Sequence, residues 1–167
     1  MNNIHGVVFI MIKNPLLFFH MNRFLAFERG AVRIYESFAK AIKDEEIKKY
    51  MEKFADIEYT HVQFWEKEII KRGGKPTTKI ADIAVFGTSL ISTGVSKTGL
   101  LNMLRLGYYS EEIAVRDYSY FVTLWRKKYP QLADKIWQIA SDEELHGIWQ
   151  KEKLYELLGI NPGKYRT

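Results

Sequence analysis

Residues 55–61 read ADIEYTH and residues 140–146 read ASDEELH, and each stretch carries a glutamate three positions before a histidine. The two pairs are Glu58 with His61 and Glu143 with His146. Residues three apart lie on one face of a helix, so each pair can direct a carboxylate and an imidazole at one metal ion. Two such pairs on separate helices, joined by one Glu from each of two further helices, form the dimetal carboxylate site of certain four-helix bundles.

An internal repeat supplies the two further glutamates. The stretch from Glu28 reads ERGAVRIYESF and the stretch from Glu111 reads EEIAVRDYSYF, which aligns Tyr35 with Tyr118. The offset between these stretches is 83 residues (111 minus 28), and the offset between the Glu-x-x-His pairs is 85 (143 minus 58). The difference of two residues falls in the turn between paired helices. We therefore interpret the chain as two copies of one helical hairpin.

Capping residues and helix breakers predict an all-α fold with four long helices. Asn14 followed by Pro15 is typical of a helix start, and Asp44 is a good cap for the next helix. Residues 75 to about 98 form a long apolar crossover, in which we expect a short helix near residues 80–93. The predicted bundle helices span about residues 15–42, 44–72, 99–128 and 130–158. Two hairpins joined by one long crossover are the connectivity of a ferritin-like bundle.

Composition limits the classes of protein that fit. A length of 167 residues predicts a single domain over residues 1–167, with the bundle at about 15–158. The absence of Cys excludes disulfides, Fe–S clusters and thiol nucleophiles. The net charge is +5, and the basic residues are interleaved with acidic ones along the chain. This pattern gives no indication of a nucleic-acid partner. No secretory signal or spanning segment is recognisable, so we expect a cytoplasmic protein without membrane insertion.

The four glutamates are expected to be buried, because apolar residues flank both Glu-x-x-His pairs. These neighbours are Phe54, Ile57, Phe64 and Trp65 for the first pair, and Ile139, Leu145 and Trp149 for the second. A carboxylate in an apolar core costs roughly several kcal/mol unless it is paired or bound to metal. Two divalent ions would resolve this cost, and the ligand types suit iron or manganese, with zinc as a competitor. The alternative is that the glutamates are ordinary solvated residues on helix surfaces.

Several neighbouring residues remain open candidates. Glu112 adjoins Glu111 but points about 100° away on a helix, so we expect it beside the site or in solvent. Tyr35 and Tyr118 lie two helical turns after the repeated glutamates, and a role beside the metals is as plausible as a core position. His5 and His20 show no partner pattern and are not predicted to be ligands.

These residues resemble the rubrerythrin and ferritin-like superfamily. More narrowly, the chain looks like the ferritin-like domain found alone or fused to membrane iron transporters of the vacuolar iron transporter type. The resemblance covers about residues 15–158. It implies that Glu58 and Glu143 bridge two metal ions, that Glu28 and Glu111 are terminal carboxylates, and that His61 and His146 each bind one metal.

The chain departs from rubrerythrins in two ways. Rubrerythrins carry a rubredoxin-like domain with four Cys, and this chain has no Cys, so electrons would have to come from an external donor. Rubrerythrins also resemble one another in a further Glu one turn after the third-helix ligand, where this chain has Ala114. A site with six ligands is therefore closer to simpler ferritin-like centres.

The sequence thus predicts a di-iron carboxylate oxidoreductase acting on peroxide, O2 or Fe(II). The alternative is a non-catalytic protein that binds, stores or delivers iron, and a purely structural helical bundle is the third hypothesis. We also expect a homodimer, because 10 Phe, 10 Tyr and 4 Trp exceed what a four-helix core usually needs.

Overall fold

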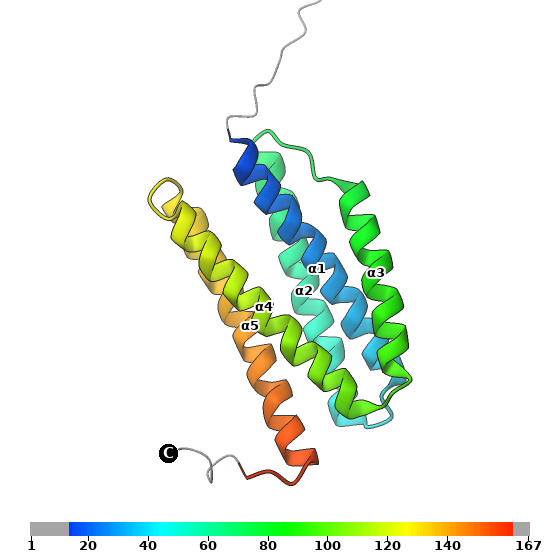
Figure 1. Cartoon of the computed structure of the whole chain (residues 1–167). Coiled ribbons are helices and arrows are strands. Elements are labelled where there is room, and N and C mark those ends of the chain that lie inside the picture. Colours follow the sequence, from blue (N-terminus) through cyan, green and yellow to red (C-terminus); the bar gives the residue numbers. More distant parts are fainter. Residues whose placement is uncertain (1–13, 162–167) are drawn as a thin grey trace, which may run out of the picture.

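The structure is a computed structural model that describes residues 14–161, apart from the side chains of residues 78–86. The described part of the chain is all-α, as predicted, and contains no strand. Its helices are α1 (Pro15–Ala41), α2 (Glu45–Lys71), α3 (Thr78–Ser96), α4 (Leu100–Trp125) and α5 (Pro130–Leu157). Helices α1 and α2 form one antiparallel hairpin, α4 and α5 form the second, and α3 lies alongside α1 in the crossover (Figure 1).

The predicted capping signals act where the sequence places them. The side chain of Asn14 accepts a hydrogen bond from the backbone N–H of Leu17 at 3.2 Å, and Pro15 is the first residue of α1. Asp44 accepts from two backbone N–H groups at the start of α2, each at 3.0 Å. Gly73 ends α2 with a φ of +82°, a left-handed conformation that glycine adopts without a steric penalty. The boundaries of α1 and α2 therefore follow from local chemistry.

The crossover differs from the prediction. A short helix was expected near residues 80–93, but α3 has 19 residues and spans nearly the whole connection. Gly, Ser and Thr lower the intrinsic helix propensity of this segment, so its helix depends on packing against α1. A Cβ added to Gly30 of α1 would lie only 3.1 Å from Cγ2 of Thr88. The small residue at position 30 therefore permits the close approach of the two helices.

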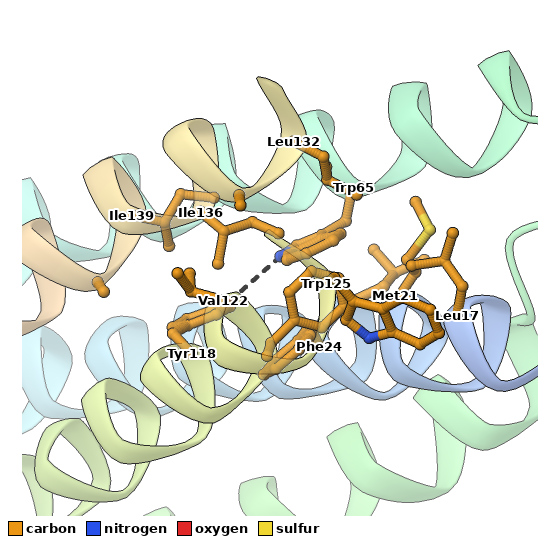
Figure 2. Close-up of a cluster of buried hydrophobic side chains, with 14 of the residues drawn as sticks. Leu17, Met21, Phe24, Trp65, Tyr118, Val122, Trp125, Leu132, Ile136 and Ile139 are labelled. Atoms are coloured by element: carbon orange, nitrogen blue, oxygen red, sulfur yellow. Dashed lines mark hydrogen bonds between the residues drawn. The ribbon is translucent and has the colours of Figure 1, made fainter. Parts of the chain in front are cut away.

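A buried aromatic layer joins all four bundle helices (Figure 2). The indole of Trp65 stacks on Phe24 and on Tyr118, with ring centroids 5.2 Å and 6.1 Å apart, and its Nε1 donates to the Tyr118 hydroxyl at 3.2 Å. A second apolar cluster around Phe38 and Met51 lies further along the helices. On every bundle helix, the predicted metal ligands fall between the residues of these two clusters.

Within the described residues, no helix has the length and apolar character needed to cross a membrane.

Candidate metal centre

The fold brings the six predicted ligands together in the middle of the bundle. One group consists of Glu28, Glu58, His61 and Glu143, and the other of Glu58, Glu111, Glu143 and His146. In each group the potential ligand atoms all lie within 4.8 Å of one another. None of the six residues is more than 4% exposed. The expectation that these glutamates are buried is confirmed.

Glu58 and Glu143 each belong to both groups, so they are the residues that could serve both metal ions. The Nδ1 atom of His61 lies 3.2 Å from Oε1 of Glu143 and 3.5 Å from Oε2 of Glu58. The Nδ1 atom of His146 lies 3.1 Å from Oε1 of Glu58 and 3.5 Å from Oε2 of Glu143. Each of these two carboxylates therefore directs one oxygen toward each imidazole.

The donor set fits two divalent cations. Buried polar atoms are normally hydrogen-bonded, yet many at this site have no hydrogen-bond partner within the described structure. They are Glu28 Oε1, both carboxylate oxygens of Glu58 and of Glu143, Nδ1 of His61, and both ring nitrogens of His146. Four carboxylates and two neutral imidazoles balance the charge of two divalent ions, and these ligand types suit iron or manganese.

Protons compensate the charge when no cation does. Burial, followed by repulsion from Glu143 and Glu58, raises the pKa of Glu28 well above its usual value. Burial and the same two carboxylates likewise raise the pKa of Glu111. The pKa of Glu58 is instead held far below its usual value, because the nearby imidazoles of His146 and His61 stabilise its charged form more than burial disfavours it. The metal-free site is therefore a mixture of neutral and charged carboxylates.

The two imidazoles are the basic groups of this mixture. Burial alone would lower the pKa of His61, but the adjacent carboxylates of Glu143 and Glu58 favour its charged form and raise the pKa to about 10. The same balance raises the pKa of His146 to about 9. Both rings are therefore protonated in the metal-free protein at neutral pH.

Metal loading should release protons, because an imidazole binds a metal only in its neutral form. At pH 7, the binding of each metal ion is expected to release roughly one proton from the imidazole that binds it. Since the folded-state pKa values of both histidines are raised, competition from protons weakens as pH increases toward about 9 to 10, and apparent metal affinity should rise. Calorimetric zinc titrations in buffers of different ionisation enthalpy measure the proton count. An affinity independent of pH between 6 and 8 would contradict this assignment of ligands.

Tyr35 and Tyr118 are both buried but make different contacts. The Tyr35 hydroxyl donates a hydrogen bond to Oε1 of Glu111 and accepts one from Nε2 of Gln150 at 2.9 Å. The Tyr118 hydroxyl accepts from Trp65 instead. Trp65 and Gln150 each lie four residues after the site histidine of their own helix, so they occupy equivalent positions of the repeat. Gln150 was not predicted as a residue beside the site; the repeat marks its position but not its contact with Tyr35.

Gly107 makes room for the Gln150 side chain. A Cβ at position 107 would lie 1.6 Å from Oε1 of Gln150, which is fully buried. We expect Gly107→Ala to displace the amide from Tyr35 and to lower the free energy of unfolding by about 1 to 2 kcal/mol, since overpacking outweighs the gain in helix propensity. Urea denaturation measures this change.

The matched control for this prediction is a double variant. Adding Gln150→Ala to Gly107→Ala removes the side chain that clashes, so the two substitutions should be clearly non-additive. Additive effects would show that the contact between positions 107 and 150 does not determine the cost.

Other residues singled out in the sequence have different outcomes. Glu112 is exposed and accepts a hydrogen bond from Tyr108, as expected for a residue beside the site. Leu145 was expected to cover the second pair, but it is 63% exposed, because it directly precedes His146 and therefore points away from the ligand face. Phe54 covers His146 instead, with ring centroids 4.2 Å apart.

The two histidines without a partner pattern are not brought to the site. His20 packs edge-on against Phe121 and Trp125, and it belongs to neither ligand group. His5 lies outside the described residues.

A cavity of about 820 Å3 reaches the metal centre from the side of α1, α3 and α4. All four site glutamates line its inner end. Its remaining wall is mainly apolar and includes Phe24 and Ala114. Phe19, Phe27 and Ile91 also line it, and these side chains are exposed at the surface of the bundle. The site therefore combines a carboxylate-rich centre with an apolar access route.

A four-helix bundle whose helices contribute four buried Glu and two His defines a dimetal carboxylate protein of the ferritin-like class. Comparison with protein-family models makes the assignment narrower. The chain belongs to the family of the ubiquinone biosynthesis protein COQ7, whose model matches residues 25–147 and so includes all six ligands. A search of curated proteins gave no match.

The family assignment refines the earlier resemblance. COQ7 proteins are di-iron members of the ferritin-like superfamily, and the buried carboxylates and histidines here can bind two metal ions. The match supports a di-metal oxidoreductase in general. It does not extend to rubrerythrins or to proteins associated with vacuolar iron transporters.

Proposed function

We propose that this protein is an O2-dependent di-iron hydroxylase that acts on the ring of a lipophilic, quinone-type substrate. The observation that carries the proposal is the apolar cavity that ends at the four site glutamates. The COQ7 family, di-iron carboxylate hydroxylases of ubiquinone biosynthesis, supports the same reaction class.

The cavity has the properties of a site for an apolar organic molecule. Its volume of about 820 Å3 lies in the range of small-molecule sites, which are mostly apolar with a few polar groups. Phe18, Phe24 and Phe27 supply aromatic surface on α1, and Ser110 supplies a hydroxyl from α4. A substituted aromatic ring with an apolar tail matches this lining. Peroxide or a free ferrous ion would need neither the volume nor the aromatic wall.

Ala114 favours an organic substrate over rubrerythrin-like peroxide chemistry. It lies on α4 one turn after Glu111, at the position where rubrerythrins carry a further Glu, and here it lines the cavity. A methyl group in place of a carboxylate leaves space beside the metal centre. It also removes a potential seventh ligand.

The reaction inserts one oxygen atom of O2 into a ring C–H bond, and the other leaves as water with two electrons and two protons from an external donor. Two iron ions, when bound, supply the redox capacity that activates O2. Glu58 and Glu143 would hold both ions, and Tyr35 orients Glu111 through its hydrogen bond. The apolar cavity excludes water from the reacting ring. We expect the electrons to come from an external donor, since these 167 residues contain no Cys to hold an iron–sulfur cluster.

The test is a single-turnover reaction with isotope-labelled O2. Protein loaded anaerobically with Fe(II) is mixed with a short-tailed quinol that has a free ring position, and products are identified by mass spectrometry. Incorporation of labelled oxygen into the ring supports the proposal. Rapid consumption of peroxide or Fe(II) without ring oxidation would favour the alternative activities, and tight iron binding without turnover would favour iron storage or delivery.

A further inference from the structure

The outer nitrogens of the two site histidines have different surroundings. Nε2 of His61 lies 3.2 Å from Oδ2 of Asp142, a hydrogen-bonded contact that reaches from one hairpin to the other. Nε2 of His146 is buried and has no hydrogen-bond partner in the part of the chain that the structure describes. The two halves of the site are therefore unequal outside the ligand set.

The internal repeat explains this inequality. Asp142 directly precedes the bridging residue Glu143, and in the first half of the chain Ile57 directly precedes the equivalent Glu58. A carboxylate can accept a hydrogen bond from an imidazole N–H, and an isoleucine side chain cannot. The inequality is thus built into the sequence at one pair of equivalent positions.

A carboxylate behind a metal-binding histidine changes the ligand in two ways. It holds the outer nitrogen in its N–H form, which fixes the tautomer and the ring orientation and leaves Nδ1 free for the metal. It also makes the imidazole a stronger donor. Among the residues that the structure describes, the His146 ring has no such acceptor and instead packs against aromatic rings, with the centroids of Phe54 and Tyr35 at 4.2 Å and 6.1 Å.

We propose that Asp142 is a positioning residue that makes the metal position at Glu28 and His61 the tighter of the two, so that this position fills first. The inference rests on the di-metal centre but not on the hydroxylation reaction. Asp142 does not touch the metals in this scheme and acts only through His61.

Stepwise cobalt titration under nitrogen, followed by visible absorption, tests the proposal without any turnover. Wild-type protein should bind two ions with unequal affinity. Asp142→Ala should weaken the tighter step by about tenfold to a hundredfold, the range found when such partners are lost, and should leave the weaker step unchanged. Asp142→Asn keeps an acceptor oxygen without the charge. The affinity of its tighter step should therefore lie between those of wild type and Asp142→Ala. Glu144→Ala is the matched control, because Glu144 is an exposed carboxylate on the same helix.

Single-site backgrounds identify which position Asp142 affects. In His146→Ala, the position with His61 is the one that keeps its imidazole, and adding Asp142→Ala should weaken the remaining binding step. In His61→Ala, adding Asp142→Ala should change nothing, because the affected ligand is gone. Equal effects in both backgrounds would overturn the proposal, since a general loss of structure does not distinguish the two positions.

A gain-of-function variant provides an independent test. Ile57→Asp places a carboxylate at the position equivalent to Asp142, and it should strengthen the weaker step and make the two steps more alike. No strengthening in a variant with wild-type circular dichroism would contradict the idea that the outer acceptor sets the order of filling.

The outcomes also separate this inference from the proposed function. Wild-type protein that binds two cobalt ions in two equal steps overturns the inference and leaves the hydroxylase proposal standing. Ordered filling that depends on Asp142, together with no ring oxidation, supports the inference and contradicts the hydroxylase. Protein that binds no metal at all overturns both.

Discussion

Glu58→Ala is expected to abolish the binding of both metal ions rather than one. Glu58 is fully buried and belongs to both ligand groups, so its loss removes a carboxylate from each metal position at once. It also leaves His61 and His146 without one of their two shared carboxylate partners. Glu143→Ala should have the same effect for the same reason.

Elemental analysis after anaerobic Fe(II) loading and removal of excess metal measures the result. Wild-type protein should retain about two irons per chain, and either variant close to none. Glu112→Ala is the control, because Glu112 is an exposed carboxylate adjacent to Glu111 and should be dispensable. Unchanged iron content in either bridging variant would remove the basis for a dinuclear centre.

The second large effect is expected from filling the cavity. Ala114→Phe adds a ring to the cavity wall one helical turn from Glu111, where the cavity has room for it. Because the added ring competes with the substrate for the same space, kcat/KM for a bulky quinol should fall at least about tenfold, or about 1.4 kcal/mol of transition-state stabilisation. The six ligands are untouched, so iron content should stay unchanged.

The control for Ala114→Phe is a substitution at the preceding residue. Ile113 is exposed and is not part of the cavity wall, so Ile113→Phe should leave both iron content and turnover unchanged. Kinetics on the two variants and elemental analysis of both give the comparison. Full activity of Ala114→Phe on a long-tailed quinol would place the substrate elsewhere, and loss of iron would mean that position 114 supports the ligands instead.

The convergence of the six candidate ligands was predictable from sequence because helical periodicity is a local property. The spacing in Glu58 and His61 places both on one helix face, and the repeat identifies the partners on the other helices. Contacts between hairpins are not local, so the spacing could not show that Asp142 meets His61 or that Gln150 meets Tyr35.

The length of α3 and the presence of the cavity could not be predicted from the sequence, for a different reason. Its Gly, Ser and Thr content indicates a weak helix, and its 19-residue length reflects packing along α1. A cavity is the space left between elements, and its lining can be read only after they are placed. The ligand pattern is shared across the ferritin-like superfamily, so it led to the superfamily correctly but did not separate the COQ7 family from rubrerythrins.

The division into two hairpins has a consequence for the stability of the metal-free protein. Within each hairpin the helices pack closely, whereas each metal position takes ligands from both hairpins. Bound metal ions would therefore add a link between the two hairpins, beside the apolar cluster that already joins them. A newly made molecule that has not acquired iron has buried acids facing one another across this joint, and its halves are held together less firmly. Iron supply would then govern how long the molecule survives as well as whether it is active.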